Sequence, residues 1–340
     1  MNGIMTVLIA IIVFLFIIMV HEFGHFITAK MFHVKVPEFA IGFGPAIFKR
    51  QKGETLYSLR AFPIGGYVRM EGEDENSDDV NALCNKPIWQ RIIIVAAGAF
   101  LNILMGFIIY AIVYAQMPQM PILTVQSVYE NTPAFEYLMP GDKITAVNGN
   151  KVWYYKDFKF LINTIDAGKE IKLTVKRGDE KLNINITPQY DKQSKSYILG
   201  FQMKQENMTW WRVLKYGVCE TFFIIRVILY SLFMLFTGKV AITSVSGPVG
   251  TVGIMSKAAS NGFYSFIQLF AMLTVNVGVF NLLPIPALDG GRVFFMFVEL
   301  LRGKPIDPQK EGVVHFAGLV LLLAFMLFIT VNDITTLIKR

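Results

Sequence analysis

The stretch IMTVLIAIIVFLFIIMVHEFGHFIT, residues 4–28, decides how this chain is built. It exceeds the ~20 apolar residues that a helix needs to cross the hydrocarbon of a bilayer, yet it contains His21, Glu22 and His25. On a helix, the HExxH pattern places two imidazoles one turn apart on one face, where both can bind zinc, and the glutamate between them can act as a general base. Because ionisable groups within a membrane segment indicate a functional site, the stretch predicts hydrolysis at a metal within the membrane.

The composition of the whole chain is typical of an integral membrane protein. Of its 340 residues, 54% are hydrophobic and 17% are charged, whereas soluble domains carry about 25% charged residues. The net charge of +7 does not indicate nucleic-acid binding, because the lysines of residues 143–215 alternate with acids and no recognition motif accompanies them. The N-terminus lacks the basic region and the cleavage site of a signal peptide, so we expect the first apolar segment to be retained.

Four stretches are predicted to span the membrane, at residues 4–28, 92–115, 263–283 and 313–331. Basic residues cluster in the segments that follow the first stretch, precede the second and follow the third. The positive-inside rule therefore places residues 31–90 in the cytoplasm. The N-terminus, residues 117–215 and the C-terminus then lie outside, which separates Cys84 from Cys219 and argues against a disulfide.

A fifth apolar stretch, residues 221–237, is shorter and is interrupted by Arg226. If it crossed the membrane, the next span would run in the opposite direction and would carry Asp289 away from His25. We therefore expect an interfacial or partly inserted amphipathic helix. The alternative is an ordinary fifth span.

Two segments outside the spans have strand-like patterns. Residues 36–70 are unusually apolar for a loop and predict a β-hairpin that turns at Gln51-Lys52-Gly53-Glu54. Residues 122–204 predict a compact α/β module, with an amphipathic helix at Tyr155–Ile165 among several strands.

A catalytic zinc site needs three protein ligands and an open position, and Asp289 is the candidate for the third ligand. It follows the span at 263–283, and the prolines before it and the glycines after it allow the chain to turn the carboxylate back into the bundle. The alternatives are inert, hydrogen-bonded histidines and an aspartate that merely caps the helix at 292–301. His33 and His315 are expected to be interfacial side chains, not ligands.

HEFGHF at 21–26 together with FNLLPIPALDGGR at 280–292 strongly resembles the site-2 protease family of intramembrane zinc metalloproteases. Within that family, the chain looks like the bacterial regulator-of-sigma-factor proteases. Three shorter stretches extend the match: GFGP at 42–45, IGGYVRM at 64–70 and SGPVG at 246–250. The module between the second and third spans resembles a PDZ domain, on the motifs PA at 133–134, PGDKI at 140–144 and VNG at 147–149.

The resemblance implies that His21, His25 and Asp289 bind zinc and that Glu22 is the catalytic base. Family members often carry Gly-Pro-x-x-Asn in the second span. This chain has GAFLN at 98–102 without the proline, which leaves the placement of its asparagine open.

Asn102 and Asn281 match family positions that contact the substrate backbone. The alternative for both is hydrogen bonding between helices within the bundle. Because a transmembrane helix hides its carbonyls in i→i−4 hydrogen bonds, a substrate must unwind locally. We expect the hairpin to offer an edge strand to the unwound segment. The strand residues concerned are Leu56, Tyr57, Ser58 and Leu59.

The expected fold is a polytopic α-helical membrane protein with four transmembrane helices. It has a membrane-associated β-hairpin on the cytoplasmic side and one inserted extracytoplasmic PDZ-like α/β domain. The expected parts are residues 1–116 with the first two helices, 117–204 as the PDZ-like domain, 205–262 as a linker with the interfacial helix, and 263–340 with the last two helices.

The predicted function is a zinc-dependent intramembrane endopeptidase of the bacterial plasma membrane. Its expected substrates are single-span membrane proteins, either an anti-sigma factor or remnant signal peptides, which an upstream site-1 protease cuts first. The PDZ-like domain would exclude bulky ectodomains or bind newly exposed C-termini. Two rivals remain: a PDZ membrane scaffold with a relic metal site, and a metal transporter that uses the same three ligands. Neither rival needs Glu22.

Overall fold

The computed structural model describes residues 3–164, 169–191 and 196–338. It divides into two compact units. The first consists of Met1–Ile109 with Ile224–Arg340, and the second is Tyr110–Phe223. The expected PDZ-like domain, residues 117–204, falls within the second unit.

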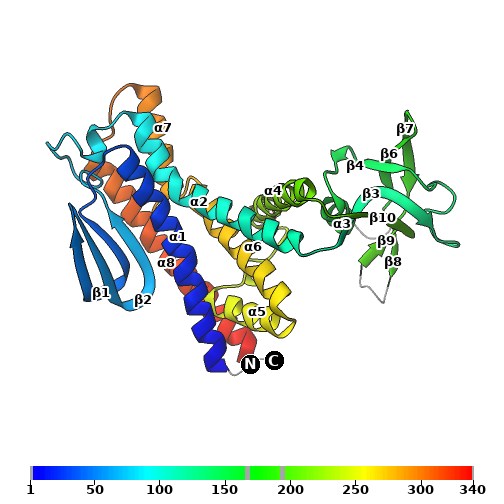
Figure 1. Ribbon diagram of the computed structural model, residues 1–340, viewed down its shortest axis with the longest axis horizontal. Coiled ribbons are helices and arrows are strands. Elements are labelled where there is room, and N and C mark those ends of the chain that lie inside the picture. The colour runs from blue at the N-terminus through cyan, green and yellow to red at the C-terminus, as the bar shows by residue number, and fades with distance from the viewer. Residues whose placement is uncertain (1–2, 165–168, 192–195, 339–340) are drawn as a thin grey trace. The chain divides into compact units, whose positions relative to one another are not determined.

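The first unit is a helical bundle that carries a β-hairpin (Figure 1). Its helices are α1 (Gly3–Met31), most of α2 (Ile88–Ala115), the second half of α4 (Trp210–Phe236), α5 (Pro248–Ser260), α6 (Phe263–Leu282), α7 (Asp289–Arg302) and α8 (Pro308–Ile338). Helix α1 packs against α5 and α6, and α5 also packs against α8. Ala10, Val13 and Ile17 form a core there with Met255 and Leu273.

Within the described residues, five helices are long and apolar enough to cross a membrane: Met5–Met31, Ile88–Ala115, Trp210–Phe236, Phe263–Leu282 and Pro308–Thr336. Many large apolar side chains of α8 are exposed, as expected for a helix that faces lipid rather than water. The chain is thus a polytopic membrane protein. The four predicted spans coincide with four of these helices, and the number of actual crossings stays a prediction.

The fifth apolar stretch belongs to a longer helix than its sequence indicates. Helix α4 is continuous over 27 residues, and Arg226 does not interrupt it. The apolar run that begins at Thr221 is preceded by an amphipathic segment that continues the same helix. Length and composition therefore make α4 a candidate span, while the expected interfacial placement of residues 221–237 stays a prediction.

The hairpin predicted in residues 36–70 is present, and its strands are β1 (Glu38–Lys52) and β2 (Thr55–Arg69). Both strands bend, so residues 38–41 pair with 66–69 on one side and with 56–59 on the other. Gly42 and Gly44 at the bend of β1 have φ of 85° and 86°, a region that only glycine enters without strain.

The expectation that residues 56–59 form an edge strand is wrong in this sheet. Ser58 pairs with both Ala40 and Lys49, and its neighbours are likewise paired on both sides. The bend of β1, which the sequence did not reveal, brings a second segment against them. In the pairing of β1 with β2, the unpaired edges are the outer sides of residues 46–52 and 66–69.

The second unit contains a six-stranded sheet with the order β10-β3-β4-β6-β7, in which β5 pairs with β4. These strands are β3 (Gln119–Val128), β4 (Lys143–Val147), β5 (Asn150–Lys151), β6 (Ile171–Arg177), β7 (Glu180–Ile186) and β10 (Phe201–Asn207). Helix α3 (Tyr155–Asn163) and the short hairpin of β8 (Gln189–Asp191) and β9 (Ser196–Ile198) complete it. The predicted end of the helix at Ile165 lies outside the described residues.

Apolar residues on alternate positions of these strands form the core of the second unit, among them Val125, Ile144 and Leu173. The Pro140-Gly141-Asp142 turn is anchored by an ion pair. Arg177 donates hydrogen bonds from Nε and Nη2 to the two carboxylate oxygens of Asp142, each at 2.8 Å. Because the Asp142 side chain is buried, this two-point contact supplies the partners that a buried charge requires.

Candidate metal centre

His21, His25 and Asp289 converge at one point of the first unit. His21 Nε2 lies 3.0 Å and His25 Nε2 lies 3.3 Å from Asp289 Oδ2, and the two nitrogens are 3.2 Å apart. In the described part of the chain, no other group of three or more His, Cys, Asp or Glu side chains could hold a metal ion. The distances agree with tetrahedral zinc, whose nitrogen and oxygen ligands at ~2.0–2.1 Å lie about 3.3 Å from one another.

The chemistry of these three groups also fits a cation. Asp289 Oδ2 is buried without a hydrogen-bond partner. Both histidines are more than 90% buried, and their facing nitrogens can share at most one proton. Unshared electron pairs that converge in a buried place are costly unless something positive binds them.

Helix α2 fixes the ring of His25. His25 Nδ1 lies 2.9 Å from the carbonyl oxygen of Ile94. Because a carbonyl can only accept, Nδ1 must carry the hydrogen, and Nε2 then presents its electron pair to the ligand cluster. Such a partner behind a metal-binding histidine sets its tautomer and its orientation. Sequence reasoning could not have found Ile94, because its backbone and not its side chain makes the contact.

Asn102 occupies the corresponding place behind His21. Its side chain is fully buried, Nδ2 lies 3.4 Å from His21 Nδ1, and Oδ1 has no partner. The oxygen and nitrogen of an amide are exchanged by a 180° rotation. In the rotated form Oδ1 accepts the proton of His21 Nδ1, which leaves His21 Nε2 free for a metal. The structure therefore places Asn102 against a candidate ligand.

Close approach of α1 and α2 depends on two glycines. A Cβ added to Gly98 would lie 2.3 Å from His25 Nε2, and one added to Gly24 would lie 2.5 Å from the Ala97 carbonyl oxygen. Any side chain at either position would force the helices apart. Ile94, Gly98 and Asn102 are spaced by four residues, so one face of α2 provides the whole wall behind the histidines.

Asp289 is the first residue of α7, and a tight loop carries it to the histidines. Helix α6 ends at Leu282, as the following Pro284 and Pro286 predict. A Cβ on Gly290 would lie 2.2 Å from the Leu283 carbonyl oxygen. The glycine after the aspartate is thus required because the loop folds directly onto the start of α7.

Glu22 lies beside the ligands and against strand β2. Its side chain is half-buried, and its carboxylate lies close to the backbone of Val68. A Cβ added to Gly66 would lie 3.6 Å from Glu22 Cγ. The strand segment at 66–69 therefore runs along the candidate base.

The remaining predicted residues make other contacts. Asn281 Nδ2 donates to the Val277 carbonyl of its own helix at 3.0 Å. Leu56, Tyr57, Ser58 and Leu59 lie in the interior of the hairpin sheet. Ser58 is buried, and its hydroxyl donates to Glu38 Oε1 at 2.7 Å.

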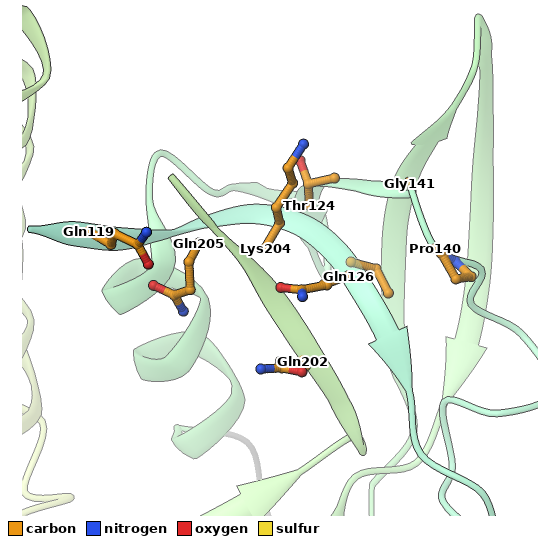
Figure 2. Close-up of a pocket in the computed structure, with 9 residues that line it drawn as sticks. Gln119, Thr124, Gln126, Pro140, Gly141, Gln202, Lys204 and Gln205 are labelled. Atoms are coloured by element: carbon orange, nitrogen blue, oxygen red, sulfur yellow. The ribbon is translucent and has the colours of Figure 1, made fainter. Parts of the chain in front are cut away.

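The second unit has a pocket of about 540 Å³ beside β3 and β10 (Figure 2). Amides dominate its lining, with Gln119, Gln126, Gln202 and Gln205 around Lys204. It contains no carboxylate and no imidazole. This pocket therefore has neither the ligands nor the base that hydrolysis requires.

A helical membrane fold with an HExxH helix and a carboxylate as the third candidate ligand at the same point defines a membrane-embedded metalloprotease. The chain belongs to peptidase family M50, whose model matches residues 9–325. It is 38% identical to a Clostridium acetobutylicum protein with the name "putative zinc metalloprotease", over 97% of each chain. It is 29% identical to the regulator of sigma-W protease RasP of Bacillus subtilis, over 98% of this chain and 99% of that one.

A quarter of the chain is similar to a solved structure, the PDZ domain of an SdrC-like protein from Listeria monocytogenes. The identity is 27%, the match covers 25% of this chain and 88% of that chain, and the TM-score is 0.23.

The family and the relatives together establish the activity. The protein is a zinc metalloprotease that acts within the membrane, of the type that serves regulated proteolysis.

Proposed function

We propose that His21, His25 and Asp289 hold the catalytic zinc and that Glu22 is the general base of peptide-bond hydrolysis. The observation that carries the proposal is the convergence of three ligand atoms within 3.3 Å of one another, around a buried carboxylate oxygen that has no hydrogen-bond partner. Zinc bound there would polarise a scissile carbonyl and make a water molecule more acidic.

Glu22 moves the protons of the reaction. It is adjacent to His21 on α1, and its side chain lies against Gly66 of β2, beside the ligands. From this place it takes a proton from the attacking water and delivers it to the leaving nitrogen. Ile94 and Asn102 keep the histidine rings oriented during this exchange.

We infer that the substrate binds along residues 66–69 of β2. An unwound segment must exchange its lost helical hydrogen bonds for others, and an exposed strand edge offers them. The outer side of residues 66–69 is unpaired in the hairpin sheet and adjoins Glu22. This edge replaces residues 56–59, whose backbone groups are already paired.

The proposed substrate class rests on the similarity of this chain to a relative. One relative is named a regulator of sigma-W protease. We propose that this chain likewise cuts single-span membrane proteins, either an anti-sigma factor or remnant signal peptides, after an upstream site-1 protease has made the first cut. The PDZ-like domain, residues 117–204, would filter these substrates by size.

We propose a bacterial plasma-membrane location with both termini and the PDZ-like domain outside. Helices α1 and α6 run in the same direction, because residues 10–17 pack near 266–273 while His25 meets Asp289. The chain between the PDZ-like domain and α6 therefore crosses the membrane an even number of times. Helix α5 has 13 residues and is ~20 Å long, too short for a crossing of ~30 Å. This supports an interfacial α4 and four spans.

The test is cleavage of a tagged single-span reporter in detergent, with zinc measured in the same samples. Glu22→Gln should lower the rate by about 10²–10⁴-fold and should leave zinc at one per chain. Asp289→Ala should lose both zinc and activity. Full cleavage by Glu22→Gln would contradict the assigned base, and persistent zinc transport by that variant would support the transporter instead.

A further inference from the structure

The loop before Asp289 contains a backbone conformation that its sequence does not favour. Ala287 has φ of 76°, in the left-handed region where a Cβ meets the following carbonyl. The next residue but one is Asp289. A strained residue persists only when its surroundings hold it, so a neighbouring element must fix this loop.

Helix α8 provides two contacts to the loop. The backbone N–H of Ala287 donates a hydrogen bond to His315 Nδ1 at 3.0 Å. Three residues further along α8, a Cβ added to Gly318 would lie 2.5 Å from Pro286 Cβ and 2.7 Å from its carbonyl oxygen. Residues three apart share a helix face. One face of α8 therefore accepts the hydrogen bond of Ala287 and packs closely against Pro286.

The ring of His315 is also packed against a neighbouring side chain. Its side chain is mostly buried and packs against the ring of Phe295, with centroids 5.6 Å apart. Since Nδ1 accepts from Ala287, the ring hydrogen is on Nε2. That nitrogen is buried without a hydrogen-bond partner, and the nearest carboxylate oxygen given for it is Glu311 Oε1 at 3.7 Å, one turn earlier on the same helix.

We propose that His315 and Gly318 are positioning residues for Asp289. Together they hold the Pro286–Ala287 turn in the conformation that delivers the carboxylate to His21 and His25. Without them Ala287 relaxes to negative φ, the chain direction changes two residues before Asp289, and Oδ2 leaves the ligand cluster. This inference rests on the proposed function, because it takes Asp289 to be a zinc ligand. His315, which was expected to be an interfacial side chain and not a ligand, would then support a ligand.

The test measures zinc affinity by chelator competition in full-length protein that carries Glu22→Gln, so that no readout depends on activity. His315→Leu removes the acceptor and should weaken zinc binding by about 10–100-fold, as loss of a supporting partner does at other zinc sites. His315→Asn keeps an oxygen near the place of Nδ1 and should stay close to the parent. Equal affinity in the Leu and parent proteins would overturn the proposal.

A matched pair of glycines tests the steric contact. Gly318→Ala should weaken zinc binding, because its methyl group displaces Pro286. Gly312→Ala is the control on the same helix, since nothing lies within 4 Å of a Cβ there. Equal zinc affinity in the two variants would contradict the role of Gly318.

A second substitution separates positioning from general stability. Glycine adopts positive φ without strain, so adding Ala287→Gly to His315→Leu should recover part of the lost zinc affinity. No recovery would mean that the backbone of residue 287 is not what His315 maintains. Asp289→Ala serves as the reference. If it leaves zinc affinity unchanged, the ligand set of the proposed function is wrong. If it abolishes binding while the α8 variants bind normally, only the inference about α8 is wrong.

Discussion

At the scale of single residues, the site depends on which nitrogen of each histidine faces the ligand cluster. The Ile94 carbonyl settles this for His25, and Asn102 is the only group placed behind His21 among the contacts that the described residues make to that ring. The two supporting groups lie two turns apart on α2. Asn102 was predicted either to hold substrate or to hydrogen-bond between helices, and its contact with His21 fits the second alternative.

Asn102→Ala should therefore weaken zinc binding by about 10–100-fold, because His21 loses the acceptor that fixes its tautomer. Chelator competition measures this directly. Asn281→Ala is the matched control, since its amide donates to the backbone of its own helix in the described part of the chain. If Asn102→Ala kept full zinc affinity and raised only KM, the substrate-binding interpretation would be restored.

At the scale of elements, the hairpin sheet and helices α1 and α2 form one packed body. Val34, Val36 and Val68 bury their side chains with Ala29 of α1 and Ile94 of α2. This core holds the segment at 66–69 beside Glu22. The opposite edge, residues 46–52, is the most solvent-exposed part of the sheet.

Substrate cross-linking distinguishes the two edges. In Glu22→Gln protein without its native cysteines, Arg69→Cys should form disulfides with cysteines placed near the scissile bond of a trapped substrate. Lys49→Cys, on the far edge, should form few. Equal or reversed yields would show that substrate does not align on residues 66–69.

At the scale of the whole molecule, the direction of α6 constrains the membrane topology. With α1 and α6 parallel and α5 too short to cross, we expect an interfacial α4 if the PDZ-like domain lies outside. Lys239, just after α4, then lies outside as well. Lys239→Cys should react with a membrane-impermeant maleimide in intact cells, as Gln205→Cys should, whereas Lys304→Cys should not. Protection of position 239 would mean that α4 crosses the membrane.

The size-filter role of the PDZ-like domain is tested by deleting residues 122–204. The ends can be joined, because Pro121 and Gln205 are paired neighbours in β3 and β10. Buried Glu220 accepts hydrogen bonds from Tyr154 and Lys156, which the deletion removes, so Glu220→Gln should accompany it and serves alone as the control. Cleavage of substrates with intact ectodomains should rise. A fall would indicate recruitment by this domain.

The sequence by itself determined four of the long apolar helices, the HExxH helix, the hairpin and the candidate third ligand Asp289. These depend on local properties: apolar length, helical spacing, and the chain breaks at Pro284 and Pro286. The sequence did not determine which edge of the hairpin sheet is free. Which hairpin edge is free depends on a bend that brings residues 38–41 between two other segments, and a pattern of alternation does not encode that pairing.

Only the tertiary structure decided how the ligands are supported. The partners of His25 and Ala287 are the Ile94 carbonyl, 69 residues away, and His315, 28 residues away. Such contacts join distant elements through backbone groups or close packing at glycine. The type and spacing of residues in the sequence do not predict which elements will meet in this way. Two short motifs thus supply the chemical groups of the site, whereas helices α1, α2, α7 and α8 set its geometry when the chain has folded.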